Sequence, residues 1–518
     1  VLNNNYMNVL KSSSIYSFFT FLSRIFGYLR DILIANFLGT GIYADIFFVA
    51  FRFPNTFRRI FSEGALNTAF VPIYSKIRAK KNVHETQNFS GNIIMFFSVI
   101  IVFLVVFIEM FMPYFIQLLA PGFVQIEEKF EELVYVARII FPFILLITIT
   151  SIYSTILNLH DKFAISASIP IVLNIVLCIS TIYAFLFSFS ILYFLSIGVI
   201  VSGTLQLIIV IFAASYENIK INLFAKIDFT NLKNFFKLFF PAFLSSGVLQ
   251  INILIGTIIV SYQSGAVSFL YYADRVYQLP LALIGVALSI VLLPMISREI
   301  SVKEYGSANK IVNETLIYSL LITAPAAIAL ITIPEIIISV LFERGEFDNN
   351  STLSTAHALR MFGFGLVAFI IMKILTPIFF AYENPKPTFY IAVINLLINT
   401  VISIILFKQI GFIGVAISTS ISAWVTVIIM WQFLIRKGYL SVDTKILKPI
   451  SAIIASCTVL YLYLIFLKLY FLVYFNETLI FKTLFLVITV VTSILLYFFI
   501  ISFYKPFAYK NLKKALVK

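Results

Sequence analysis

Long apolar runs follow one another along the whole chain, and short polar segments separate them. Most runs reach the roughly 20 residues that an α-helix needs to cross about 30 Å of hydrocarbon. They do not alternate between apolar and polar positions, residues 93–108 being an example, so a transmembrane β-barrel is not predicted. We predict an all-α membrane protein with about fourteen transmembrane helices, over residues 13–39, 44–75, 88–118, 131–157, 163–187, 191–216, 231–260, 266–297, 309–333, 355–381, 386–407, 412–435, 446–469 and 479–503.

Composition and charge agree with a chain that lipid surrounds. Hydrophobic residues make up 61% and charged residues 12%, with a mean hydropathy of +1.03, whereas soluble domains are typically about a quarter charged. Lysine and arginine collect in alternate loops, such as residues 76–81 and 298–310, while intervening loops such as 127–132 are acidic. This is the positive-inside pattern, so we expect both termini in the cytoplasm, including the basic tail 504–518. The net charge of +14 has no aromatic–basic surface motif beside it, and we expect no nucleic-acid partner.

A weak internal repeat predicts two related lobes. The tripeptide Tyr-Ala-Asp that ends at Asp45 recurs with its end at Asp274, and Pro72 has a counterpart in Pro294. The two helices that carry these motifs are six apart, so two parallel six-helix lobes are expected, with the substrate between them. The predicted organisation is an N-lobe over 7–216, a basic amphipathic cytoplasmic link over 217–237 that runs into the seventh helix, a C-lobe over 231–435, and two additional helices within 446–503.

Charged residues are concentrated in the first two predicted helices. They are Arg24, Arg30, Asp31, Asp45, Arg52, Arg58, Arg59 and Glu63. Each charge at mid-bilayer costs about 2.5–3.5 kcal/mol on insertion scales, so this density cannot face lipid. Arginine exceeds acid here, and guanidinium groups that converge on a cavity suit a phosphate or pyrophosphate. Arg275 would add a guanidinium from the second lobe. The alternative is that the charges only join helices, for example by a pair between Arg24 and Asp31, seven residues apart.

The helical phase of the second helix is ambiguous. On a straight helix, Asp45, Arg52, Arg59 and Glu63 share one face and Arg58 points elsewhere. Pro54 interrupts that helix, however, and makes the phase beyond it unreliable.

A combination of short motifs carries a family resemblance. The motifs lie at residues 23–31, 44–45, 53–65, 69–72, 120–123, 271–275 and 285–288. Together they resemble the MurJ (MviN) lipid II flippases of the multidrug/oligosaccharidyl-lipid/polysaccharide exporter superfamily, over essentially the whole chain. The resemblance implies two six-helix lobes in a V around a cationic cavity, with a groove for the lipid tail near the two C-terminal helices. By matching positions it assigns substrate binding to Arg24, Arg30, Arg58, Arg275 and Ser23, and important acids to Asp45 and Glu63. We expect Asp31, Arg52, Arg59 and Asp274 to be further supporting charges of the cavity.

The function expected from this resemblance is transport rather than catalysis. Lipid II, an undecaprenyl-pyrophosphate-linked peptidoglycan precursor, would pass from the cytoplasmic to the periplasmic leaflet of a bacterial inner membrane by alternating access, with Asp45 and Glu63 holding the arginines in place. We expect no cofactor, a membrane potential or monovalent cation gradient as the driving force, a monomer, and lipid II and membrane lipids as partners. Cell-wall synthesis proteins are further candidate partners.

Other readings make different demands on the sequence. A flippase for another polyprenyl-pyrophosphate oligosaccharide would share these arginines, whereas a multidrug antiporter of the same superfamily would need carboxylates for a cationic drug. A membrane glycosyltransferase or acyltransferase would need clustered aspartates or histidines, and the histidines are scattered. Asn252, Asn395 and Asn399 form a possible polar or cation cluster. Since none of the three is an acid, interhelical hydrogen bonding is the favoured role.

Overall fold

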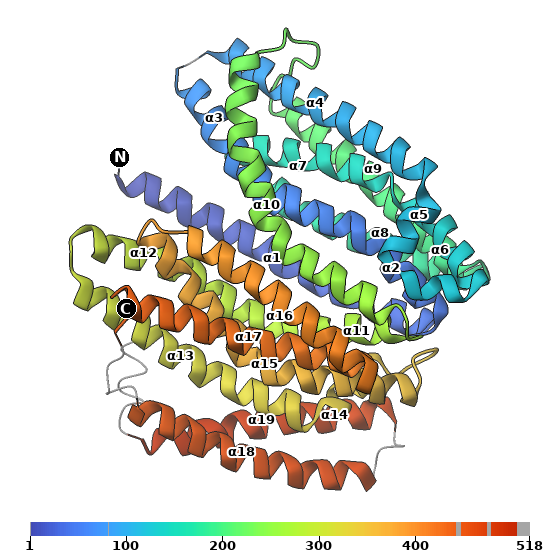
Figure 1. Ribbon diagram of the computed structural model, residues 1–518, viewed down its shortest axis with the longest axis vertical. Coiled ribbons are helices and arrows are strands. Elements are labelled where there is room, and N and C mark those ends of the chain that lie inside the picture. Colours follow the sequence, from blue (N-terminus) through green and yellow to red (C-terminus); the bar gives the residue numbers. More distant parts are fainter. Residues whose placement is uncertain (1, 81, 442–446, 474–477, 505–518) are drawn as a thin grey trace. The chain divides into compact units, whose positions relative to one another are not determined.

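A computed structural model describes residues 2–80, 82–441, 447–473 and 478–504 of the chain (Figure 1). The described part is helical and contains no strand, which confirms the predicted all-α class. Eleven of its helices are long and apolar enough to span a membrane. Residues 13–39, 44–75 and 266–297, which carry the predicted site charges, have no counterpart among those eleven, and the count of fourteen stays a prediction.

The helices form two units, each packed mainly within itself. The first unit extends to Ser268 and also includes Arg344–Phe347, where the Glu346 N–H donates to the Asn36 carbonyl oxygen at 2.9 Å. Its helices are α1 (Leu2–Leu38), α2 (Ile42–Arg58), η1 (Arg59–Leu66), α3 (Asn67–Ala79), α4 (Val83–Met110), α5 (Met112–Leu119), η2 (Pro121–Gln125), α6 (Glu127–Ile140), α7 (Phe143–Leu159), α8 (Phe163–Leu186), α9 (Ile191–Tyr216) and α10 (Phe229–Val260).

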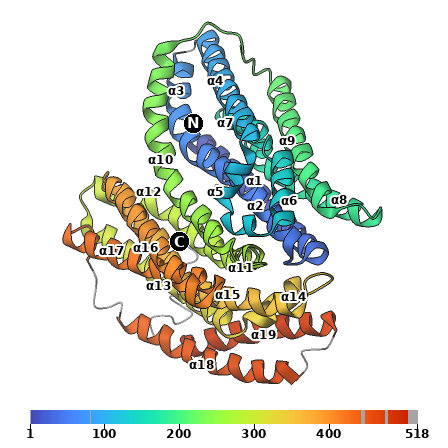
Figure 2. The same ribbon diagram turned by 45° about the vertical axis from the view of Figure 1, so that its right-hand side comes forward.

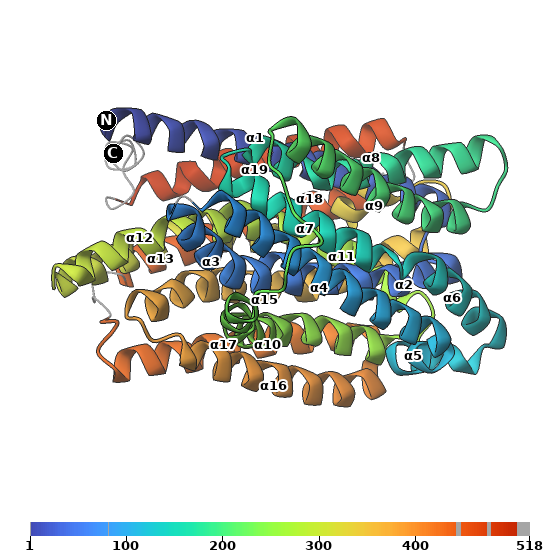
Figure 3. The ribbon, with the colours of Figure 1, turned by 90° about the horizontal axis from the view of Figure 1, so that it is seen from above.

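The second unit begins at Phe269, within α11 (Ala266–Pro280). In this unit α16 (Lys386–Ile410) packs along α17 (Phe412–Arg436), and α17 along α15 (Asn349–Ala381) (Figure 3). Its other helices are η3 (Leu281–Val286), α12 (Ala287–Ser301), α13 (Tyr305–Thr332), α14 (Pro334–Phe342), α18 (Leu447–Val473) and α19 (Leu479–Ser502).

The α18–α19 hairpin packs on α13 and α14 of the second unit (Figure 2). The contact is an apolar cluster that includes Leu321, Ile333, Leu460 and the buried Cys457. Residues 442–446, which precede α18, and the tail from 505 lie outside the described residues.

The long helix α10 packs with the first unit, although the sequence assigned it to the C-lobe. The rings of Phe239 and Phe97 lie 5.3 Å apart, and those of Phe239 and Phe61 lie 5.8 Å apart. At Gly64 the backbone of η1 is so close to α10 that an added Cβ would collide with the Ser246 side chain. This aromatic face and the glycine contact place α10 alongside α3 and η1 (Figure 1).

The segment before α10, residues 217–228, is not helical and crosses α4; we call it the strap. The Asn222 N–H donates to the Gln87 carbonyl oxygen at 3.3 Å. At Gly91 the strap lies against α4 so closely that any Cβ would collide with the Asn222 carbonyl. The helical part of the predicted amphipathic link therefore begins only at Phe229.

Two helices that were predicted as continuous are each interrupted by a π-helical segment. One is α2–η1–α3 and the other is α11–η3–α12. The π segments begin at Arg59 and Leu281, and these two positions are separated by the same number of residues as Pro72 and Pro294. The separation between the two Tyr-Ala-Asp motifs differs from this separation by about two helical turns. The repeat is thus carried by the interruption and the proline, and π segments of this kind are frequent at functional sites.

Candidate functional site

Arg30 is fixed between α1 and α8 by a set of buried hydrogen bonds. Its Nε and Nη2 donate to Asp31 Oδ1 at 3.0 and 2.6 Å, and its Nη1 donates to Asn174 Oδ1 at 2.9 Å. Asn174 in turn donates to the carbonyl oxygen of Ser23 at 3.0 Å. Arg30 is 5% exposed and Asp31 2%. The sequence suggested Asp31 as a partner of Arg24, but Asp31 pairs with Arg30. Arg30 joins α1 to α8 through its hydrogen bond to Asn174.

Arg24 lies on the same helix but differs from Arg30 in its exposure and its partners. Its side chain is exposed, and within the described part of the chain no hydrogen bond or ion pair engages it. Arg59 is half-buried, and its guanidinium likewise has no such partner among the described residues. These two groups are available to an anionic ligand.

Asp45 is fully buried, and its partners are not arginines. Lys129 of α6 approaches its Oδ2 at 3.1 Å, and the Gly265 N–H donates to the same oxygen at 2.8 Å. Its Oδ1 accepts from the Ser268 N–H at 3.0 Å and from the Ser268 hydroxyl at 2.7 Å. The Lys129 ammonium also lies over the Phe123 ring, 3.6 Å from its centroid. The expectation that Asp45 holds a cavity arginine is therefore corrected: Asp45 accepts from the first-turn N–H groups of α11, where a negative charge is stabilised.

The remaining charges of the second predicted helix lie around the start of η1. Arg52 and Arg58 are half-buried, and Arg58 Nε donates to Asn55 Oδ1 at 3.2 Å. Arg58 ends α2 and Arg59 begins η1, so the straight-helix phase does not hold beyond this point. The side chain of Glu63 lies outside the described residues.

In the second unit, Arg275 lies beside Tyr271 on α11. Its Nη2 donates to the Tyr271 hydroxyl at 2.8 Å, and its guanidinium carbon is 4.9 Å from the centroid of that ring. This geometry allows a cation–π contact that orients the guanidinium. Asp274 accepts a hydrogen bond from Gln278. Arg24 and Arg275 belong to different units, and their convergence on one cavity stays a prediction.

The asparagines of α16 join that helix to α17. Asn395 Nδ2 donates to Thr426 Oγ1 at 2.6 Å and to the Ser422 carbonyl oxygen at 3.2 Å. Asn399 Oδ1 accepts from the Ser418 hydroxyl at 2.9 Å. These are interhelical hydrogen bonds, the role that the sequence favoured over a cation site. Asn252 lies on α10, within the first unit.

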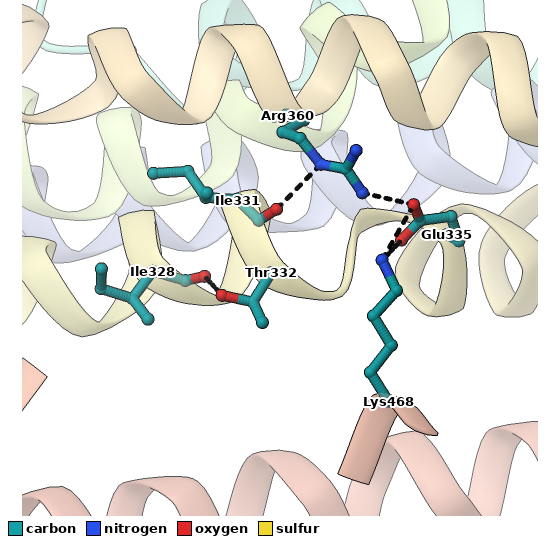
Figure 4. Close-up of polar contacts among 6 residues, drawn as sticks. All are labelled: Ile328, Ile331, Thr332, Glu335, Arg360 and Lys468. Atoms are coloured by element: carbon teal, nitrogen blue, oxygen red, sulfur yellow. Dashed lines mark hydrogen bonds and ion pairs between the residues drawn. The ribbon is translucent and has the colours of Figure 1, made fainter. Parts of the chain in front are cut away.

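Sequence reasoning missed an ionic cluster that attaches the C-terminal hairpin to α14 and α15 within the second unit. Glu335 of α14 lies between Arg360 of α15 and Lys468 of α18 (Figure 4). Lys468 Nζ is 3.1 and 3.0 Å from the two carboxylate oxygens, and Arg360 also donates to the Ile331 carbonyl oxygen at 3.0 Å. A second ion pair joins Lys482 Nζ of α19 to Glu343 Oε1 at 3.2 Å. The available signal was a single charge within each of several apolar runs.

Sequence reasoning also missed Lys373, an exposed lysine of α15. It lies near the end of that helix that we expect on the cytoplasmic side. Its Cγ lies 3.5 Å from where a Cβ on Gly285 of η3 would be, so it lies beside the second π segment. No described residue forms an ion pair with it. An ionisable side chain within an apolar helix is a candidate functional group, and this one would add to the positive charge of the second unit.

Along α19 an apolar depression of about 530 Å³ is lined by Ile494, Leu495, Leu496, Phe498 and Phe499. It lies on the C-terminal helices, where the sequence placed the lipid-tail groove.

Many apolar spans, with arginines inside otherwise apolar helices, define a multi-pass membrane protein. The fold is similar to that of an inward-facing multidrug-resistance MATE-family transporter of the MOP superfamily, with a TM-score of 0.68 over 79% of this chain and 93% of that one. The identity is 14%, so this likeness shows the fold alone.

Closer relatives identify the family. The family model for the lipid II flippase MurJ matches residues 34–491. A probable lipid II flippase MurJ of Rickettsia prowazekii (strain Madrid E) is 34% identical over 98% of this chain and 100% of its own length. A solved structure of a lipid II flippase MurJ in an inward-closed conformation has a TM-score of 0.80 and 29% identity over 96% of this chain and 99% of that one. The chain belongs to the MurJ family of lipid II flippases, and the resemblance read from its motifs is confirmed.

Proposed function

We propose that the chain moves lipid II from the cytoplasmic to the periplasmic leaflet of a bacterial inner membrane by alternating access. Family membership supports the substrate. The observation that carries the proposed site is the exposed Arg24 guanidinium, which no described side chain neutralises. A pyrophosphate offers the oxygen array that an arginine fork binds. Arg59 would add a second contact in the first unit, and Arg275, oriented by Tyr271, would add one from the second.

The proposed driving force follows from the charge of the substrate. A pyrophosphate diester carries two negative charges, and an inside-negative potential favours export of each by about 2.3 kcal/mol per 100 mV. Transport would then need neither ATP nor a cofactor. A monovalent cation gradient remains the alternative source. Both termini would be cytoplasmic and the working form a monomer.

The lipid tail would stay in the membrane beside α19. The apolar depression there presents leucine and phenylalanine side chains, and the ion pairs of Glu335 and Lys482 attach the hairpin to the rest of the second unit. The depression on α19 that would contact the lipid tail would therefore move together with the second unit.

The test is translocation of labelled lipid II in proteoliposomes with and without an imposed inside-negative potential. Arg24→Ala should lower the rate by about tenfold or more, since a hydrogen bond to a charged group contributes about 1.5–3 kcal/mol. Arg24→Lys should keep part of the activity, because it retains the charge without the fork. Arg436→Ala removes an exposed arginine from the end of α17 and is the matched control. Wild-type rates in Arg24→Ala would refute the anion site.

A further inference from the structure

A pocket of about 120 Å³ lies in the first unit, where α3, α4, the α7–α8 turn and the strap meet. Its lining includes Tyr74, Arg78, Gln87, His160, Asn218 and Lys220. One water needs roughly 10–15 Å³ of such space, so the pocket has room for a phosphate group. None of the arginines assigned to the transported substrate lines it.

Contacts between α3, the α7–α8 turn, α4 and the strap hold the elements around this pocket together. The Tyr74 hydroxyl and His160 Nε2 are 2.8 Å apart, and Arg78 donates to the carbonyl oxygen of Leu159. Beyond the pocket lining, the Asn92 side chain of α4 donates to the Lys226 carbonyl oxygen of the strap at 3.2 Å. With Gly91 pressed against the strap, the pocket is formed before any ligand arrives.

The pocket has positive charge and free donors, and no acidic side chain is part of its described lining. Arg78 and Lys220 are its two cations, and both are exposed. The side-chain amides of Gln87 and Asn218 have no hydrogen-bond partner among the described residues. Burial, followed by the nearby Arg78, lowers the pKa of His160, so this histidine is neutral and leaves the charge to Arg78 and Lys220.

Two of the acidic groups near this end of the first unit are already engaged, and a third, the exposed Asp161 beside His160, does not line the pocket. Glu217 pairs with Lys162 at 2.7 Å, and Glu85 accepts from the Asn82 side chain at 2.9 Å. The charged side chains that line the pocket are therefore both cations. Such a lining favours a ligand with a negative charge.

The strap and the helix ends that flank it expose aromatic side chains. Phe224 of the strap is 87% exposed, and Phe229 at the start of α10 is 77% exposed. Tyr216, at the end of α9, is also 77% exposed. Aromatic residues of this kind lie at membrane–water interfaces, and the basic loops place this end of the unit on the cytoplasmic side.

We propose that the pocket binds the phosphate of an anionic phospholipid from the cytoplasmic leaflet. Basic pockets between transmembrane helices on that side recognise such headgroups. Arg78 and Lys220 would bind the phosphate oxygens, Gln87 and Asn218 would donate to it, and the acyl chains would lie against Phe224 and Phe229. The lipid would hold the strap and the α3 end together as a regulatory ligand, distinct from the transported lipid.

The test measures the affinity of the purified full chain in detergent micelles for phosphatidylglycerol by native mass spectrometry, with phosphatidylcholine as the zwitterionic comparison. Each cation removed should weaken phosphatidylglycerol binding about fivefold. The variants are Lys220→Gln and the double variant Arg78→Gln/Lys220→Gln. The charge-matched control is Lys76→Gln/Lys80→Gln, whose lysines are exposed at the same end of α3 but do not line the pocket.

The proposal is supported if phosphatidylglycerol is preferred over phosphatidylcholine and only the pocket variants lose that preference. Lys220→Gln guards against a folding artefact, since its side chain makes no contact that the fold needs within the described structure. Equal losses in the control variant would overturn the proposal in favour of general surface attraction. If inorganic phosphate alone displaces phosphatidylglycerol and stabilises the protein equally, the ligand is a soluble phosphate and the lipid assignment is wrong.

Discussion

Arg24 and Arg30 lie six residues apart on one helix, yet they occupy opposite environments. Arg30 is buried and bonded to Asp31 and Asn174, whereas Arg24 is exposed with no described partner. Asp45 repeats the first environment, because Lys129 and the α11 N-terminus surround it. A charge within an apolar run therefore marks either a structural anchor or a ligand contact, and burial with a partner separates the two.

Asp45→Ala tests the anchored side of this comparison and should have the largest effect on stability. It leaves Lys129, whose side chain is 2% exposed, buried without its counter-charge, and loss of one member of a buried pair typically costs about 3–5 kcal/mol. We expect a large fall in the thermal unfolding midpoint in micelles. The additional change Lys129→Met should restore part of it.

Glu128→Gln, an exposed acid next to Lys129 on α6, is the control for Asp45→Ala. It should leave the midpoint within the range of ordinary surface substitutions, about 0.5 kcal/mol. An Asp45→Ala protein as stable as this control would show that Asp45 is not an anchor.

Asn174→Ala tests whether Arg30 depends on its uncharged partner. The change removes the Asn174 acceptor from a buried guanidinium, which keeps its hydrogen bonds to Asp31. Leaving a buried donor unsatisfied costs about 1–3 kcal/mol, so unfolding in denaturant should shift by that amount. Thr204→Ala, on the exposed face of α9, should be close to neutral. Equal effects of the two changes would mean that Asn174 does not support Arg30.

The sequence predicted the part of the fold that the lipid environment dictates, which is the helical structure of the apolar runs. Every apolar run had to be a helix, because a spanning segment must satisfy its own backbone. The π segments after Arg58 and Pro280 and the strap over Gly91 were not predictable, since they depend on packing between residues distant in the chain. The positions of the charges were likewise readable, but their partners were not. Nothing near Asp45 in the sequence indicates Lys129 or Ser268.

Lys468→Ala extends the comparison to a half-exposed ion pair and should have the smallest effect. The side chains of Lys468 and Glu335 are 26% and 16% exposed, and Glu335 keeps Arg360 as a partner after the change (Figure 4). A partly solvated pair of this kind contributes up to about 1 kcal/mol, so the thermal midpoint should change little. Glu335→Ala should cost more, because it leaves two cations beside one another. If Lys468→Ala instead destabilised the protein as much as Asp45→Ala, partnered charges in the second unit would be anchors of equal weight, and burial would no longer distinguish structural from ligand-binding charges.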